Sequence, residues 1–248
     1  MLSSNNSAPG SASINHIIIA NLYEIAVCTF EVLTEVMKSL FIEIVLLAAS
    51  IKGFSQRQDF YDSIVAHYNF LNNKPFAPLQ LEDTTGNLFN TAVLTGKTVY
   101  VDFWFTACPP CIKEIPYAEK LQKYFAPDTN IVFLSICIEN TKNKPTWKQM
   151  IKEKQMTGVH LFYARNRPQR INLLRQYQIT FPTYLLLNKE MKVIGYDAPR
   201  PSQTGWVQWS ILKAKEGKYL SQSFKAMRAN SVEYKAFIAT NCFSNRVL

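Results

Sequence analysis

The chain has 248 residues, of which 48% are apolar and 18% charged, and 27 Lys or Arg against 18 Asp or Glu give a formal net charge of +9. This apolar fraction can build a packed core, which excludes wholesale disorder, and 8 Gly with 12 Pro exclude a collagen-like or low-complexity chain. Five cysteines in a chain of this length do not make a disulfide-stapled miniprotein. The length allows one or two domains.

The net charge divides unevenly near residue 55. Residues 1–55 contain two basic and four acidic residues, so this segment has a net charge of −2 and the remainder +11. Ile17–Ile51 is dominated by apolar residues, and polar sequence begins at Ser55. The first 55 residues are therefore predicted to be a hydrophobic leader with a role of their own.

The leader contains the layout of a secretory signal peptide, starting at Met37. One lysine is followed by about a dozen mostly apolar residues and then by small residues before a polar stretch. Leu40–Ser50 is shorter than the roughly 20 apolar residues that span a membrane, and Glu43 opposes insertion. We expect an exported protein, periplasmic or anchored in the inner membrane facing the periplasm, whose natural start is Met37. An uncleaved helical anchor over Ile14–Ile51 and a cytosolic helical extension remain alternatives.

A Cys-x-x-Cys pair lies where a predicted strand meets a predicted helix. Lys97–Phe105 is rich in β-branched and aromatic residues and predicts a buried strand, while residues 112–121 have helical spacing. At this junction the sulfurs of Cys108 and Cys111 can bridge, and the helix dipole stabilises the first thiolate. The pattern predicts thiol-disulfide exchange, with Cys108 as the attacking nucleophile and Cys111 as the resolving thiol.

Two other uses of such a pair have less support. A structural zinc site needs two further ligands, and the remaining cysteines and the three histidines form no second pair, so no metal is expected. A peroxidatic cysteine of the peroxiredoxin type would have Thr three residues earlier, where this chain has Phe105. Cys137 lies in a predicted strand and is expected to be a core residue. The expected redox group is the Cys108–Cys111 disulfide, with no separate cofactor.

Several motifs between about Pro75 and Leu212 occur in the order of a known family. They are Asp83-x-x-Gly86, Gly96-Lys97, the run Asp102 to Pro116 across both cysteines, and Tyr177 to Leu187. Together they resemble the TlpA/ResA-like, redoxin-like branch of the thioredoxin superfamily. The resemblance implies an α/β thioredoxin fold: a mixed central β-sheet flanked by helices, with an N-terminal β-hairpin and an inserted helix and strand.

The resemblance also implies roles for residues around the cysteines. Pro182 is expected to be cis, which would place the Phe181 backbone beside the sulfurs to pair with an extended substrate chain. Asp102 matches the family's buried acid, which assists deprotonation of Cys111, and a lone carboxylate in an apolar strand is costly to bury without such a use. Trp104 is expected to pack beside the site. The predicted substrate-binding residues are Phe181, Pro182, Trp104, Pro109 and Pro110.

Two departures from the family pattern concern the first cysteine. Ala107 replaces a bulky aromatic residue, which should leave Cys108 more exposed. The Pro-Pro dipeptide after Cys108 has no N–H, so the first backbone donors for a Cys108 thiolate are those of Cys111 and Ile112. A thiolate with few donors predicts a reducing protein and not a strong oxidant.

The rest of the chain predicts the elements that complete this fold. Strands are expected at Ile131–Ile138, His160–Ala164, Thr183–Leu187 and Lys192–Gly195, and helices at Lys144–Gln155, Arg167–Gln178, from Ser202 to about Lys215, and as one helix over Ser221–Ile238. The expected parts are therefore an extension at residues 56–74, a thioredoxin-like domain at residues 75–216 and a helical tail at residues 217–248.

Basic residues cluster within the mature region. Nine basic residues and one acidic residue lie between Lys142 and Arg175. This stretch is either a face that docks onto an acidic partner or onto an anionic membrane surface, or simply a solvated basic face. No recognition motif accompanies the basic residues, so nucleic acid is not an expected partner.

These observations predict a monomeric thiol-disulfide oxidoreductase that reduces protein disulfides in the periplasm. Its expected partners are protein disulfide substrates and an upstream thiol reductant, and its N-terminal segment would associate with the membrane. The alternative is a non-catalytic module in which the groove beside Pro182 holds a peptide or another domain. The intact Cys108 and Cys111 pair favours the enzyme.

Overall fold

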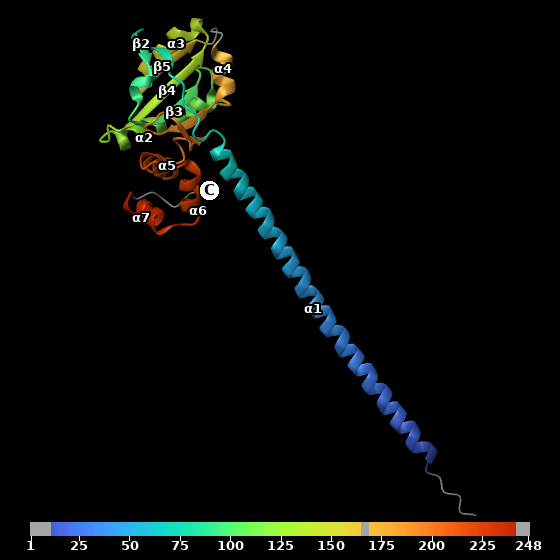
Figure 1. Ribbon diagram of the computed structural model, residues 1–248. Helices are drawn as coiled ribbons and strands as arrows, with labels where there is room; N and C mark the ends of the chain where they lie inside the picture. The colour runs from blue at the N-terminus through green and yellow to red at the C-terminus, as the bar shows by residue number, and fades with distance from the viewer. Residues whose placement is uncertain (1–10, 165–168, 242–248) are drawn as a thin grey trace, which may run out of the picture. The chain divides into compact units, whose positions relative to one another are not determined.

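A computed structural model describes residues 11–164 and 169–241. The chain divides into two compact units, Met1–Tyr61 and Asp62–Leu248. Helix α1 (Ser11–Asn69) supplies the described part of the first unit (Figure 1). The change to polar composition at Ser55 does not end this helix, because residues such as Gln and Arg are good helix formers.

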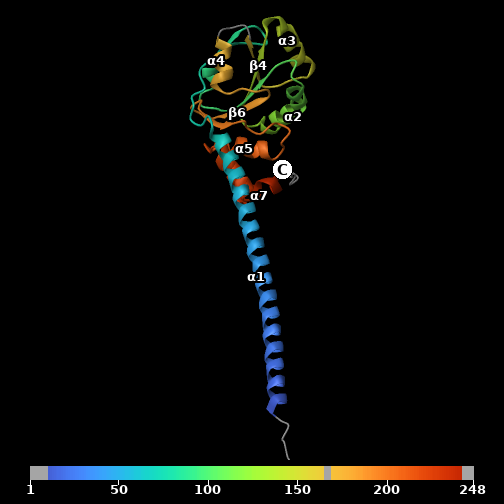
Figure 2. The same ribbon diagram turned by 90° about the vertical axis from the view of Figure 1, so that its right-hand side faces the viewer.

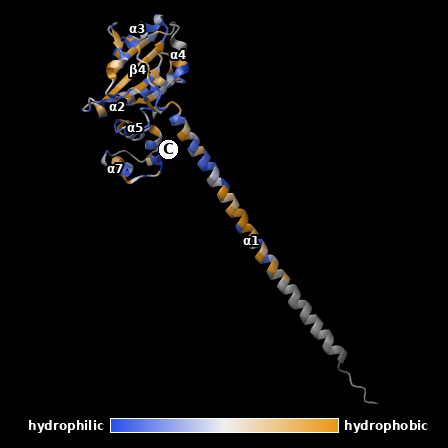
Figure 3. Cartoon of the chain, viewed as in Figure 1, coloured by the Kyte–Doolittle hydropathy of each residue, from blue (hydrophilic) through white to orange (hydrophobic). Residues whose placement is uncertain are grey.

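Helix α1 carries exposed apolar side chains over the signal-like segment. Leu40, Phe41, Leu46 and Leu47 are all more than half exposed, and Figure 3 colours this part of the helix as hydrophobic. Within residues 11–164 and 169–241, no helix combines the length and apolar character that crossing a membrane requires.

The second unit is built on one mixed sheet of seven strands among the described residues. The strand order is β2-β1-β5-β4-β3-β6-β7. The strands are β1 (Gln80–Asp83), β2 (Leu88–Asn90), β3 (Thr98–Trp104), β4 (Ile131–Glu139), β5 (Val159–Ala164), β6 (Thr183–Leu187) and β7 (Val193–Tyr196). The central strand β3 pairs in parallel with β4 and antiparallel with β6. This arrangement confirms the mixed sheet that the motifs predicted.

The N-terminal hairpin and the inserted element join the sheet at one edge. Strands β1 and β2 are antiparallel, and the turn between them has Gly86 at φ 100°, a conformation that favours glycine. The Asp83 carboxylate accepts the N–H groups of Thr85, Gly86 and Asn87 and closes the turn. Strand β5 lies between β1 and β4, so the inserted strand connects the hairpin to the central strands.

Helices cover both faces of the sheet, as Figure 2 shows for α4 on one side and α2 and α3 on the other. Their bounds, with two short 3-10 helices, are η1 (Thr91–Leu94), α2 (Pro109–Phe125), η2 (Thr141–Asn143), α3 (Lys144–Glu153), α4 (Gln169–Gln176), α5 (Trp206–Lys215), α6 (Leu220–Arg228) and α7 (Val232–Thr240). Leu173 of α4 joins the main apolar core, and Trp147 of α3 joins a second cluster around the cysteines. Helix α6 packs against β7 at Gly195, where a Cβ would lie 2.9 Å from Leu220 Cβ.

The C-terminal segment forms two helices, so the prediction of one helix over Ser221–Ile238 was wrong. Helix α6 ends before Asn230, whose φ of 49° is left-handed. Ser231 then begins α7, because its side chain accepts the N–H of Tyr234 at 3.2 Å. A left-handed Asn followed by a Ser N-cap ends one helix and begins the next. The spacing of apolar residues alone does not reveal this break.

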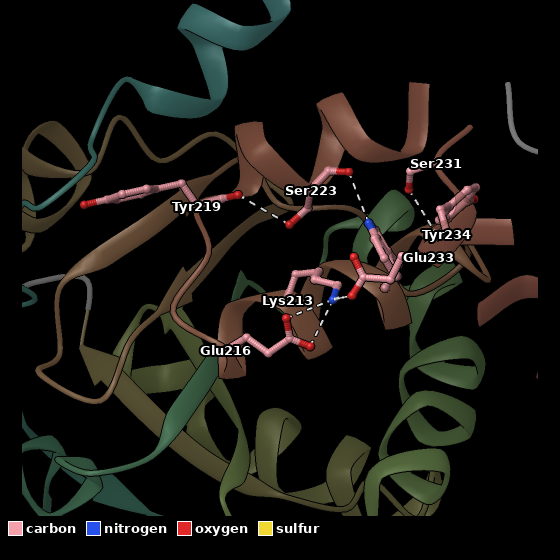
Figure 4. Close-up of polar contacts among 8 residues, drawn as sticks. Lys213, Glu216, Tyr219, Ser223, Ser231, Glu233 and Tyr234 are labelled. Carbon is pink, nitrogen blue, oxygen red and sulfur yellow. Dashed lines mark hydrogen bonds and ion pairs between the residues drawn. The ribbon is translucent and has the colours of Figure 1, made fainter. Parts of the chain in front are cut away.

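Polar contacts around the buried Lys213 and Trp209 side chains join these two helices to α5 (Figure 4). The Lys213 side chain is buried, and its Nζ donates to both Glu216 oxygens at 2.8 and 3.0 Å and to the Glu233 carboxylate. The same ammonium lies 4.6 Å from the ring centroid of Trp209, whose indole N–H donates to the Ser223 carbonyl at 3.1 Å. The tail is therefore an integral part of the folded unit through Thr240, while Cys242 lies outside the described residues.

The basic stretch is only partly described. Lys144 forms an ion pair with Glu82, and residues 165–168, which include two of the nine basic residues, lie outside the described ranges. A docking role for this stretch stays a prediction.

Candidate active site

The two predicted redox cysteines lie at the start of α2, directly after β3. Cys108 is the N-cap residue, and the prolines that follow occupy the first helical positions, where a missing N–H leaves no helical hydrogen bond unmade. Cys108 and Cys111 form a disulfide with their Cα atoms 5.3 Å apart. The backbone N–H of Cys111 also points at Cys108 Sγ, at 3.3 Å. The local sequence thus places both sulfurs at the positive end of a helix.

Two expectations about Cys108 need correction. Its side chain is 2% exposed, although Ala107 was expected to leave it more accessible. The sulfur is turned inward toward Cys111 and packs in the apolar cluster that contains Trp104. The N–H of Ile112 is also not a donor to the sulfur, because it donates to the Cys108 carbonyl at 3.0 Å. Cys111 therefore supplies the single backbone donor to Cys108 Sγ found in the described chain.

The predicted substrate-binding residues gather around the cysteines. The peptide bond between Phe181 and Pro182 is cis, as expected. Phe181 packs against the cluster of Cys108, Cys111 and Trp104. Its ring lies edge-on to the Phe105 ring, with the two ring centroids 5.1 Å apart. Pro109 and Pro110 are exposed beside Ala107. The rim beside the disulfide is therefore formed by the Pro-Pro dipeptide, Ala107 and the loop before β6, and substrate binding there stays a prediction.

Asp102 lies beneath the cysteines on β3. Its Oδ1 atom is buried and makes no hydrogen bond within the described chain. Burial, and then the negative charge of Glu114, raise the pKa of Asp102 to about 7. A carboxyl group with this pKa exchanges protons near neutral pH, which is what a base for the resolving thiol requires.

Glu114 is a buried carboxylate that sequence reasoning quoted in a motif but gave no role. Its Oε2 accepts the N–H of Ser202 at 2.9 Å and its Oε1 accepts the Ser202 hydroxyl at 2.8 Å. Glu114 is 8% exposed and sits one helical turn after Cys111. It ties α2 to the segment before α5, and its negative charge adds to the effect of burial in raising the pKa of Asp102. The Cys-x-x-Glu spacing was the available signal.

A row of polar residues crosses the sheet on the same side as Asp102. Asp102 pairs in register with Ser135 of β4, and Ser135 pairs with His160 of β5. The Ser135 hydroxyl accepts the indole N–H of Trp104 at 2.7 Å. Strand register is not visible in the sequence, so neither Ser135 nor His160 was predicted to belong to the site.

Cys137 is near the disulfide without being part of it. It pairs in register with Trp104 and is completely buried in the same cluster as Cys108 and Cys111. Burial raises the pKa of its thiol well above the usual value. A thiol in this state is inert, so Cys137 acts as the core residue that was predicted.

The arrangement is suited to dithiol chemistry. One sulfur lies at a helix N-terminus with one backbone donor, and the other lies above a carboxyl group that titrates near neutrality. Such a pair can exchange two electrons with a disulfide, the first thiolate attacking and the second releasing the product.

The comparisons with known proteins agree with this chemistry. Residues 71–207 match the family model described as Redoxin. Thiol-disulfide oxidoreductase ResA from Bacillus subtilis (strain 168) is 29% identical over 143 residues, covering 54% of this chain and 72% of the relative. Thiol-disulfide oxidoreductase ResA from Halalkalibacterium halodurans is 28% identical over 116 residues, covering 46% of this chain and 61% of the relative.

The solved structures that resemble this chain include proteins that are also named thiol-disulfide oxidoreductases. The crystal structure of the thioredoxin domain of a thiol-disulfide oxidoreductase from Bacteroides vulgatus is 25% identical, with a TM-score of 0.46, and the match covers 52% of this chain and 89% of that one. The family model spans more than half of the chain and includes β3, α2 and β6, which carry the site. The chain belongs to the Redoxin family and is a thiol-disulfide oxidoreductase.

Proposed function

We propose that the chain reduces disulfides of other proteins in the periplasm, using Cys108 and Cys111 as a reversible dithiol. The observation that carries this proposal is the placement of the pair: Cys108 caps α2 with one backbone donor, and Cys111 lies over Asp102. The ResA relatives support the reaction class. Protein substrates, the reducing direction and the compartment are parts of the proposal.

The reaction would proceed in two exchange steps. The Cys108 thiolate attacks one sulfur of the substrate disulfide, forming a mixed disulfide and releasing the other substrate sulfur as a thiolate. Cys111 then loses its proton and attacks Cys108 Sγ, which forms the Cys108–Cys111 bond and releases the second substrate thiolate. Two electrons pass from the dithiol to the substrate, and both substrate thiolates take protons from solvent. An upstream thiol reductant returns the enzyme to the dithiol.

The small number of backbone donors near Cys108 Sγ supports the reducing direction. A strong oxidant favours its reduced form because its attacking thiolate is heavily stabilised, with a pKa near ~3.5. In this chain the Pro-Pro dipeptide removes the N–H groups nearest the sulfur, and Ile112 directs its N–H to a carbonyl. Cys108 Sγ thus has less stabilisation than an oxidant needs.

The reduction potential tests this direction. The full chain would be equilibrated with glutathione or dithiothreitol buffers, and the fraction of the Cys108–Cys111 disulfide measured by mass after thiol alkylation. We expect a potential near the roughly −270 mV of thioredoxin, and Cys137→Ala should leave it unchanged. A value near the roughly −120 mV of strong oxidants would overturn the reducing role.

Export is supported by the layout of the segment from Met37 to Gln56, with its lysine, apolar run and small residues. Fractionation of the native host and sequencing of the mature N-terminus would test it. We expect a periplasmic or membrane-attached product that begins after the apolar run or retains it as an anchor. A cytosolic product that retains Met1 would contradict export.

A further inference from the structure

A small cavity lies beneath the cysteines, between α2 and the polar row of the sheet. Its volume is about 30 Å³, and Cys111, Asp102, Glu114, Ser135 and His160 all line it. A polar site of this size has room for one or two water molecules. The cavity therefore links the resolving cysteine to a histidine that lies two strands away from Asp102.

His160 is a buried titratable group that the proposed reaction steps do not use. It is 8% exposed, and neither ring nitrogen makes a well-formed hydrogen bond within the described chain, although the backbone of Met156 and Thr157 lies close. Burial lowers the pKa of His160, so the neutral imidazole is the favoured form at pH 7 and an imidazolium formed there readily gives up its proton. Such a group can pass a proton on without retaining it.

The register of the sheet places His160 within reach of Asp102 through the cavity. The two residues are separated by Ser135 alone, which corresponds to two strand spacings, or about 10 Å between backbones. All three side chains lie on one face of the sheet, because residues paired in register share a face. Both side chains line the same cavity, so water held there would connect the imidazole to the carboxyl group.

The other titratable groups at the cavity do not replace the imidazole. Glu114 is held by Ser202, and the Glu119 carboxylate accepts both the N–H and the hydroxyl of Thr157. The remaining titratable groups are the phenols Tyr100 and Tyr184, whose pKa values are raised by burial. Of the described residues that line the cavity, His160 alone can become positively charged.

An open groove borders the cavity and is lined by residues of α2, β4 and β5, but by neither redox cysteine nor the Pro-Pro dipeptide. It has a volume of about 920 Å³ and shares with the cavity the residues Ile115, Glu119, Gln122, Phe133 and Thr157. A proton that reaches the cavity could therefore pass to solvent there while a substrate protein covers the cysteines.

We propose that His160 receives the Cys111 proton from Asp102 and passes it to solvent through this groove during the resolving step. The inference rests on the proposed two-step exchange. Cys111 S–H gives its proton to the Asp102 carboxylate, Asp102 gives it through water to the neutral imidazole, and the imidazolium releases it to solvent. His160 does not touch the sulfurs and acts only through Asp102, so it is a positioning residue that assists proton removal and not a catalytic residue.

The test is the pH profile of the resolving step in His160→Gln. Mixed disulfide formation and its resolution would be followed separately by rapid quenching and mass analysis, between pH 6 and pH 9. Since proton-transferring groups contribute about 10²–10⁴-fold when they act directly, we expect resolution to slow by about tenfold below pH 8. The difference should fade toward pH 9, where hydroxide removes the proton. Mixed disulfide formation should keep its rate.

The control is His67→Gln, which alters a half-exposed histidine paired with Asp197 and should leave both steps unchanged. An unchanged resolution rate in His160→Gln would overturn the proposal, as would an equal slowing at all pH values, which indicates a structural role. If His160→Gln does not fold, His160→Asn provides the same comparison. Failure of mixed disulfide formation in the unaltered chain would instead contradict the proposed function itself.

Discussion

The two faces of the central sheet differ in chemistry although the same strands form both. One face is mostly apolar and packs into the main core through Val99, Val101, Phe103, Leu134, Ile136, Leu161 and Leu185. The other face holds the polar groups and the second cluster: Tyr100, Asp102, Trp104, Ser135, Cys137, His160 and Tyr184. Along each strand, successive residues therefore point alternately into the apolar core and toward the polar site.

This difference explains how the folded chain can bury the Asp102 carboxyl group, which lowers the free energy of unfolding. A carboxyl group buried without a hydrogen bond at Oδ1 lowers stability. The continuous apolar layer on the opposite face supplies the packing that offsets this cost. Removal of the buried carboxyl group on one face and of buried methyl groups on the other should therefore have opposite effects on stability, and three substitutions test how the faces differ.

The largest effect is expected on the apolar face. Leu134 is 1% exposed and belongs to the main core. Leu134→Ala should lower the free energy of unfolding by about 2–5 kcal/mol, since it removes buried methyl groups and leaves a cavity. Urea unfolding of the oxidised chain measures this. The matched control Leu134→Met keeps the volume and should cost less than about 1.5 kcal/mol. A loss below about 1 kcal/mol for the Ala variant would mean that this face does not carry the stability.

The opposite sign is expected for Asp102→Asn on the polar face. The folded pKa of about 7 lies above the ordinary value of 3.8, so the folded state holds the proton more tightly than the unfolded state. The carboxyl group therefore lowers stability increasingly as pH rises from about 4 to 7, and fully above that. Removing it should raise stability by about 2–4 kcal/mol at pH 8 and leave it unchanged near pH 4.

The measurement for Asp102→Asn is unfolding at both pH values, with Asp197→Asn as the control. Asp197 is half exposed and pairs with His67, so its loss should change stability by no more than about 1 kcal/mol. A stability gain of equal size at pH 4 and pH 8 would show that the effect does not come from the proton.

A smaller effect is expected for Ser135→Ala. The substitution removes the acceptor for the buried Trp104 indole N–H, which then lacks a partner. We expect the free energy of unfolding to fall by about 1 kcal/mol and the tryptophan fluorescence to change. Ser135→Thr retains a hydroxyl and should recover most of the loss. Equal losses for Ala and Thr would indicate that packing, and not the hydrogen bond, is responsible.

The sequence predicted those parts of the fold that depend on local pattern. The continuous apolar runs predicted β3 and β6, and the Asp83-x-x-Gly86 motif predicted the turn of the hairpin. The family resemblance predicted that Asp102 is a buried acid, and the cost of burying a lone carboxylate supported this interpretation. The Cys-x-x-Cys spacing predicted the disulfide, and the family resemblance predicted the cis bond at Pro182.

Contacts between distant segments could not be predicted in this way. Glu114 binds Ser202, which is 88 residues later in the chain, and His160 reaches the site only through its register with Ser135. The burial of Cys108 depends on Trp104 and Trp147 packing around it, which Ala107 alone did not reveal. The helix break at Asn230 was missed because apolar spacing continues across it.

The central claim is that Cys108 attacks and Cys111 resolves, and trapping tests it most directly. Cys111→Ala and Cys108→Ala chains would each be reduced, incubated with an oxidised protein and analysed by intact mass without reductant. The account predicts that Cys111→Ala accumulates a mixed disulfide through Cys108, whereas Cys108→Ala accumulates none. A mixed disulfide that forms equally fast on Cys111 in the Cys108→Ala chain, or none in either variant, would contradict it.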